Sequence, residues 1–84
     1  MGMNIAERVK QIVIENLELQ GSEGLVVPEA RFVEDLQADM VDIVALVMDI
    51  ELGFDIEIGD DARENIQTVG QAIALVETHL ANRV

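Results

Sequence analysis

The 84-residue chain has no cysteine and no tryptophan or tyrosine, and it has one proline and one histidine. Without cysteine, disulfides, thiolate metal sites and thiol catalysis are excluded. The aromatic side chains are Phe32 and Phe54, although half of all residues are hydrophobic. A core must therefore be built from aliphatic side chains, a composition that suits packed helices.

Long hydrophobic runs are also absent. The longest run, residues 43–48, is bounded by Asp42 and Asp49 and falls far short of the roughly 20 residues that span a bilayer. The first ten residues, "MGMNIAERVK", carry charges where a signal peptide needs an apolar segment. These features predict one cytoplasmic domain over residues 1–84 without membrane insertion.

Positive charge is scarce as well. There are 17 acidic and 5 basic residues, which gives a formal net charge of −12. Such a chain repels nucleic acid and anionic lipid and attracts basic protein surfaces. The charge therefore predicts that the protein binds other proteins and not nucleic acid. The same charge is equally compatible with a chain whose acidic residues only maintain its solubility.

The first third of the chain predicts a helix followed by a long loop. Asn4 can cap a helix over residues 4–18 with Glu7 three positions later. Its apolar face comprises Ile5, Val9, Ile12 and Val13. The segment "QGSEG", residues 20–24, ends the helix and opens a loop that contains Pro28. The side chains expected to attach this loop to the core are Leu25, Val26, Phe32 and Leu36.

The middle of the chain predicts a second helix, which Asp39 caps and Gly53 closes near residue 52. Its core-facing stripe comprises Ile43, Leu46, Val47, Ile50 and Phe54. A second apolar row, Met40, Val44 and Met48, is most simply explained as the edge of a wide buried face.

Residues 55–66 predict an extended loop and then a short helix near 60–65. Thr68 can cap a last helix with Gln71 at the third position. The buried stripe of this helix comprises Val69, Ile73, Val76 and Leu80. The predicted fold class is all-α, a four-helix bundle with a long first loop and a short third helix.

Three blocks together resemble the acyl carrier protein family: "F-x-E-D-L-x-A-D" (32–39), "V-D-I-V-A-L-V-M" (41–48) and "F-D-I-E-I" (54–58). The similarity covers essentially the whole chain and implies the family's four-helix bundle. It also implies an attachment serine, whose hydroxyl carries a 4′-phosphopantetheine arm, at the position of Met40. A thioether cannot form a phosphodiester, so the attachment position is chemically incompetent and no cofactor is expected. The remaining hydroxyls belong to Ser22, Thr68 and Thr78, away from this position.

The resemblance also implies docking through the second helix. Family members usually have a glutamate at Ala45 and further acidic residues where only Glu51 remains beside Leu52 and Gly53. Ile43 replaces what is usually a small polar residue, so this surface is more apolar than in the family. The predicted docking residues are Asp39, Met40, Val41, Asp42, Val44, Met48 and Glu51.

These features predict a non-carrying interaction or regulatory module that binds basic surfaces of acyl-transfer or lipid-synthesis enzymes, including those of fatty-acid or polyketide biosynthesis. An alternative is a conventional acyl carrier whose serine was changed to Met40. A further alternative is a free-lipid binder that uses a cavity between the helices. The oligomeric state stays open.

Catalysis and metal binding have little support in the sequence. An acidic cluster at Asp55, Glu57, Asp60 and Asp61 resembles the family's weak divalent-cation sites but lacks EF-hand spacing. We interpret it as surface charge and expect no metal site. The single histidine, His79, lacks a nearby nucleophile and is better explained by a favourable interaction with the end of the last helix. We therefore expect no enzymatic activity.

Overall fold

The computed structural model describes residues 4–82, and within them it contains four α-helices and one short 3₁₀ helix. The elements are α1 (Ile5–Leu17), η1 (Glu23–Leu25), α2 (Met40–Phe54), α3 (Asp60–Glu64) and α4 (Val69–Ala81). Over this range no strand forms, and the one β contact is an isolated bridge between Arg31 and Thr68. The predicted all-α class with a long first loop and a short third helix is confirmed.

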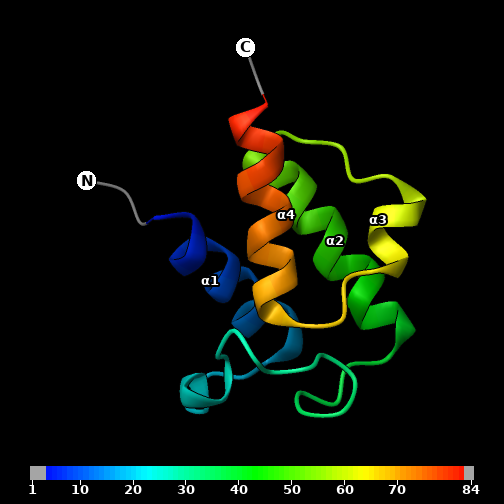
Figure 1. Ribbon diagram of the computed structural model, residues 1–84. Coiled ribbons are helices and arrows are strands. Elements are labelled where there is room, and N and C mark those ends of the chain that lie inside the picture. Colours follow the sequence, from blue (N-terminus) through cyan, green and yellow to red (C-terminus); the bar gives the residue numbers. More distant parts are fainter. Residues whose placement is uncertain (1–3, 83–84) are drawn as a thin grey trace.

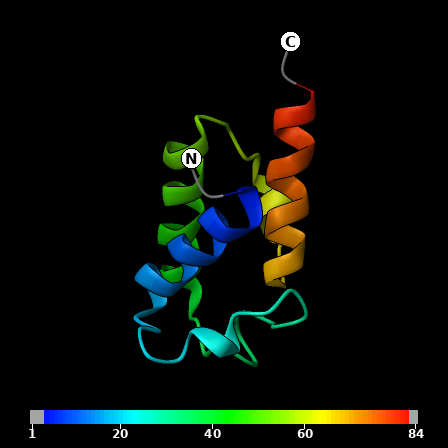
Figure 2. The ribbon, with the colours of Figure 1, turned by 90° about the vertical axis from the view of Figure 1, so that its left-hand side faces the viewer.

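The helices are arranged around α1, which packs against both α2 and α4. Figure 2 shows α1 crossing in front, with α2 on one side of it and α4 on the other. In the view of Figure 1, α1 and α3 lie on opposite sides of α2. The buried side chains between these elements are all hydrophobic within the described range. They are Val9, Val13, Ile14, Val26, Ala30, Phe32, Leu36, Ala38, Leu46, Val47, Ile50, Phe54, Ile56, Ile58, Ile66, Val69, Ala72 and Val76.

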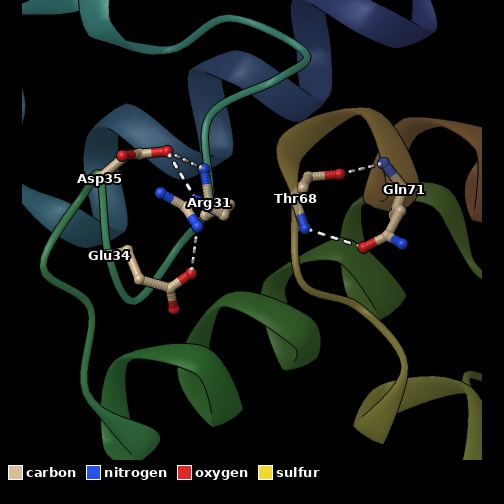
Figure 3. A network of polar contacts seen from close by, with 5 residues as sticks. All are labelled: Arg31, Glu34, Asp35, Thr68 and Gln71. Atoms are coloured by element: carbon tan, nitrogen blue, oxygen red, sulfur yellow. Dashed lines mark hydrogen bonds and ion pairs between the residues drawn. The ribbon is translucent and has the colours of Figure 1, made fainter.

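The starts of the three long helices were predicted correctly, because each is determined by a local cap. The Asn4 side-chain oxygen accepts a 2.8 Å hydrogen bond from the backbone amide of Glu7. Thr68 and Gln71 form a reciprocal pair (Figure 3). Thr68 Oγ1 accepts from the Gln71 backbone amide at 3.1 Å, and Gln71 Oε1 accepts from the Thr68 backbone amide at 2.9 Å. These bonds satisfy amides that have no partner within the helix.

The predicted end of α2 is wrong. The helix continues through Gly53 to Phe54, and Asp55 takes the left-handed capping conformation with φ 54°. The reason is a contact with α1: Nη2 of Arg8 donates a 2.6 Å hydrogen bond to the Gly53 carbonyl oxygen. The Arg8 guanidinium also lies 4.3 Å from the centre of the Phe54 ring, a favourable cation–π distance. Arg8 therefore stabilises the last turn of α2.

The long loop between α1 and α2 is attached to the start of α4 by backbone hydrogen bonds. The Phe32 amide donates to the Gln67 carbonyl at 2.9 Å, and the Gly70 amide donates to the Pro28 carbonyl at 2.9 Å. A Cβ at Gly70 would lie 3.0 Å from the Pro28 oxygen, so this close approach favours glycine. Phe32 is buried as predicted, but Leu25 is 54% exposed, which contradicts its expected role. Leu25 ends the turn of η1, and the next residue enters the core instead.

Arg31 stabilises the same loop from its surface, as Figure 3 shows. Its guanidinium lies 3.3 Å from the carboxylate of Glu34 and 3.3 Å from that of Asp35. The Arg31 amide also donates to Asp35 Oδ2 at 2.8 Å. This amide bond first, and the guanidinium second, hold the pKa of Asp35 below its ordinary value. Asp35 thus joins the two ends of the turn at residues 31–35.

Candidate functional site

The start of α2 is a well-formed helix N-terminus that presents a methionine. The Asp39 Oδ1 atom accepts from the Asp42 amide at 2.8 Å, and Asp42 Oδ2 accepts from the Asp39 amide at 3.1 Å. Met40 is the first helical residue, and its side chain is 81% exposed. The position is therefore accessible, but its thioether has no proton to exchange for a covalent bond to phosphate.

Among the described residues, no other side chain supplies a hydroxyl group at the start of α2, where Met40 has none. Thr68 Oγ1 caps α4, and Thr78 Oγ1 donates a 2.9 Å hydrogen bond to the Ala74 carbonyl within the same helix. Ser22 lies in the first loop, just before η1. The start of α2 consequently has no nucleophilic oxygen of the kind that an ester or phosphodiester requires.

A row of exposed apolar side chains runs the length of α2. Met40, Val44, Met48 and Leu52 recur every four residues and are 81, 38, 53 and 80% exposed; we call these four residues the α2 strip. Val41, 76% exposed, lies beside it. The expectation that the row at Met40, Val44 and Met48 is the edge of a buried face is therefore wrong.

The reason for this exposure is the placement of the neighbouring helices. The opposite face of α2 holds its buried side chains, Leu46, Val47, Ile50 and Phe54, and α1 packs against α2 through that side. Ile43 is partly buried against the same core and does not belong to the outer surface. Leu52, which the predicted docking set did not include, continues the four-residue spacing, and this spacing in the sequence could have identified it.

A cleft of about 680 Å³ lies beside the first two turns of α2. Its walls come from α2, from α3 and the segment after it, and from the loop around Phe32. The lining side chains are Phe32, Val33, Glu34, Met40, Ile43, Val44, Arg63, Glu64, Ile66 and Gln67. Met40 and Val44 belong to both the cleft and the α2 strip, so the two features form one surface. The sequence did not predict the contributions of α3 and the loop.

Arg63 is the one basic residue that lines the cleft. Its Nη2 atom lies 3.8 Å from Asp60 Oδ1, in a loose ion pair, and its side chain is 34% exposed. Its Nε atom is buried and has no hydrogen-bond partner among the described residues. A buried donor without an acceptor costs about 1–3 kcal/mol. An acceptor that reached this atom would recover part of that cost.

Three of the predicted docking residues are carboxylates, and the structure gives each a bond within the chain. Asp39 and Asp42 cap α2 but keep their second oxygens for other partners. Glu51 is different, because its Oε2 atom accepts a 2.7 Å, partly buried hydrogen bond from the Ile58 amide. Glu51 therefore connects α2 to the segment before α3, and its docking role stays a prediction.

The acidic cluster and His79 are the remaining groups that the sequence singled out. Within residues 4–82, no group of three or more His, Asp or Glu side chains is arranged to hold a metal ion. His79 lies in the last turn of α4, where its Nδ1 atom is 2.9 Å from the Leu75 carbonyl oxygen of the same helix. None of the described helices has the length and apolar character needed to cross a membrane.

Compared with models of known protein families, the chain matches none. Three features define the candidate site: the capped start of α2 without a hydroxyl, the α2 strip, and the adjoining cleft. Together they form one accessible surface, and the described residues place no hydroxyl at the start of α2.

Proposed function

We propose that this protein is a non-carrying member of the acyl carrier protein family and that it acts as a binding module for acyl-transfer or lipid-synthesis enzymes. The sequence blocks at 32–39, 41–48 and 54–58 support the family, and the four-helix architecture with a short α3 is compatible with it. The main support for a role without a prosthetic arm is that the exposed first residue of α2 is Met40, which has no hydroxyl.

The residues at this position do not fit the family's prosthetic group. 4′-Phosphopantetheine is joined through a hydroxyl oxygen, whereas Met40 offers a thioether. The threonine hydroxyls are engaged within α4 or at its cap, and Ser22 belongs to the first loop. The protein therefore works, in this proposal, through its surface alone.

The exposed side of α2 supports a binding role. Apolar side chains gathered on one exposed face mark interaction sites more often than scattered ones do. Asp39 and Asp42 add negative charge at one end of the α2 strip, and the whole chain has a net charge of −12. A partner with an apolar contact area and a basic rim would be complementary to this surface.

A second candidate is a conventional acyl carrier in which Met40 has replaced a functional serine. The observation that favours it is the cleft beside residue 40, whose volume of about 680 Å³ lies within the range of small-molecule sites. The codon at position 40 in the source gene discriminates between the candidates, because a serine codon there would establish the second one.

The test of the first candidate is intact-mass measurement after incubation with coenzyme A and a broad-specificity phosphopantetheinyl transferase. We expect the protein to stay unmodified and Met40→Ser to gain the mass of the arm. Val44→Ser is the matched control, since it places a hydroxyl one turn further along the same exposed row, and it should stay unmodified. Loading of the unaltered protein would refute the non-carrying role, and failure of Met40→Ser to load would remove the support for the family.

A further inference from the structure

We propose that Met40 and Met48 form a modification site, at which a peroxide converts both thioethers to sulfoxides and changes the α2 strip from an apolar to a polar surface. The consequence for partner binding rests on the proposed function, because it concerns the same surface; the chemistry at the two sulfur atoms does not. Three observations support the proposal: the absence of cysteine, the exposure of both methionines, and a core without methionine.

The chain offers an oxidant few other targets. It contains no cysteine, whose sulfur is oxidised more readily than that of methionine. Its sulfur atoms are therefore all thioethers, in Met1, Met3, Met40 and Met48, of which the first two lie outside the described residues. A two-electron oxidant that reaches this protein consequently reacts at methionine.

Both described methionines are exposed on the same face of α2. Met40 is 81% exposed and Met48 is 53% exposed, and the eight residues between them correspond to about two turns of the helix. The other two members of the α2 strip, Val44 and Leu52, have no sulfur. Half of the α2 strip is therefore oxidisable, and both of its methionines are accessible from water.

The fold does not depend on either thioether. The buried side chains of residues 4–82 include no methionine. The hydrogen bonds that cap α2 join the carboxylates of Asp39 and Asp42 to backbone amides and do not involve the Met40 side chain. Oxidation of a buried methionine places a polar oxygen in a core and disrupts it, whereas here the added oxygen stays in water. The modification therefore alters the surface of α2 and preserves its structure.

The reaction requires no catalytic group of the protein. The thioether sulfur donates an electron pair to one oxygen of hydrogen peroxide, and the O–O bond breaks. The second oxygen takes up the proton of the transferred oxygen and leaves as water, so sulfur loses two electrons and the peroxide gains them. Methionine sulfoxide reductases reverse the step with two thiols, which form a disulfide while the sulfoxide oxygen leaves as water.

Oxidation removes apolar contact area from α2. Met40 and Met48 alternate with Val44 and Leu52, so each remaining apolar side chain of the α2 strip gains a polar neighbour. Met40 also lines the cleft, and the change extends to that border. A partner with an apolar contact area must then desolvate two sulfoxides, which costs free energy unless each gains a hydrogen bond. Oxidation thus weakens binding at this surface, and reduction restores it.

The experiment exposes the full chain to hydrogen peroxide and follows the products by mass spectrometry. Trypsin, which cleaves after arginine, releases residues 32–63, and this peptide contains Met40 and Met48 and no other methionine. We expect it to gain two oxygen atoms, each at a rate within about threefold of that of free N-acetylmethionine amide, because both side chains are exposed. Methionine sulfoxide reductases A and B, with dithiothreitol, should remove both atoms.

Retention on a phenyl column measures the apolar surface of the folded protein. The oxidised protein should elute earlier than the unaltered one, and its melting temperature should change by less than about 4 °C. The matched control combines Met40→Leu with Met48→Leu, because leucine keeps an apolar side chain of similar size and forms no sulfoxide. This double variant retains Met1 and Met3, and its retention should be unchanged by the same treatment.

Each contrary result overturns the proposal. No added oxygen in the peptide of residues 32–63, or unchanged retention of the oxidised protein, would mean that the α2 strip does not respond to peroxide. An equal loss of retention in the double variant would place the effect outside α2. A melting temperature lowered by more than about 4 °C would indicate damage to the fold. Sulfoxides that the reductases leave in place would exclude a reversible site.

The loading experiment on Met40→Ser separates this proposal from the proposed function. If Met40→Ser gains the arm and oxidation of the unaltered protein leaves its retention unchanged, the non-carrying role stands and the oxidation site fails. If Met40→Ser gains no arm and oxidation changes the retention reversibly, the oxidation site stands without the family.

Discussion

Asp39 and Asp42 exchange two hydrogen bonds across the first turn of α2, each carboxylate accepting from the backbone amide of the other residue, at 2.8 and 3.1 Å. The two bonds satisfy amides at the helix start and fix the backbone on both sides of Met40. The backbone around Met40 is thus held in place by the carboxylates of its acidic neighbours, which have a structural role in the helix cap.

Replacement of Asp39 by alanine should lower the free energy of unfolding by about 1 kcal/mol, the usual cost of losing an N-cap side chain. Urea denaturation followed by circular dichroism measures this change. Glu57→Ala is the matched control, since it also removes one negative charge, from an exposed position in the loop after α2. Equal effects of the two substitutions would mean that the Asp39 cap contributes nothing beyond its charge.

Glu51 should be a structural residue. Loss of its hydrogen bond to the Ile58 amide in Glu51→Ala should cost about 1.5 kcal/mol, because the bond is partly buried and its acceptor is charged. The exchange rate of the Ile58 amide, measured by NMR, should rise. Glu51→Gln retains an acceptor oxygen and should lose less. An unchanged Ile58 exchange rate in Glu51→Ala would contradict the bond.

The parts of the fold that the sequence predicted are those that depend on neighbours along the chain. Asn4 and Thr68 were identified as helix caps because a partner lies three residues later, and Asp39 because aspartate is a favoured cap residue. The end of α2 could not be predicted in this way. Glycine is a residue type that often ends helices, but Arg8, 45 residues away, binds the Gly53 carbonyl and keeps Gly53 within the helix.

The candidate site was predicted only in part for the same reason. The spacing of Met40, Val44 and Met48 is visible in the sequence, but their exposure depends on which face of α2 the other helices cover. The cleft is lined by both Arg63 and Val33, which are 30 positions apart in the sequence. The periodicity of apolar residues within one helix does not predict that two such distant residues line the same cleft. Local rules therefore predicted the elements, and only the packed structure revealed the surface between them.

Substitution of Gly53 should distinguish a helix interior from a helix end. A Cβ there would lie 3.5 Å from Ile12 Cδ1 and 3.9 Å from Arg8 Nη2, both ordinary contacts. Gly53→Ala should therefore stabilise the protein by up to about 1 kcal/mol, the helix-propensity difference between the two residues. Thermal unfolding measures the shift.

Gly21→Ala is the matched control for this prediction. Gly21 has a φ of 88°, which L-amino acids rarely adopt, and its Cβ would meet no atom within 4 Å. Alanine there should destabilise the protein by roughly 1–2 kcal/mol through backbone strain alone. A destabilised Gly53→Ala variant would mean that the last turn of α2 requires glycine, as the sequence first suggested.

Stability should depend on pH through Asp35. The Arg31 amide, and then the Arg31 guanidinium, hold the pKa of Asp35 below its ordinary value of about 3.9. The folded state thus favours the ionised carboxylate, so this contribution to stability is fully present above about pH 4 and disappears as the pH falls through the lower, folded-state pKa. We expect Asp35→Asn to lower the melting temperature at pH 7, and the difference from the unaltered protein to narrow below pH 4.

The neighbouring ion pair provides the control for this pH dependence. Glu34 lies 3.3 Å from the Arg31 guanidinium in an exposed pair, and no backbone amide donates to it among the hydrogen bonds of residues 4–82. Exposed pairs of this kind contribute little to stability, so Glu34→Gln should change the melting temperature less than Asp35→Asn at pH 7. If the two substitutions gave the same melting temperatures from pH 7 to pH 3, the stabilisation would come from the charge of the loop, and the amide bond to Asp35 would have no separate effect.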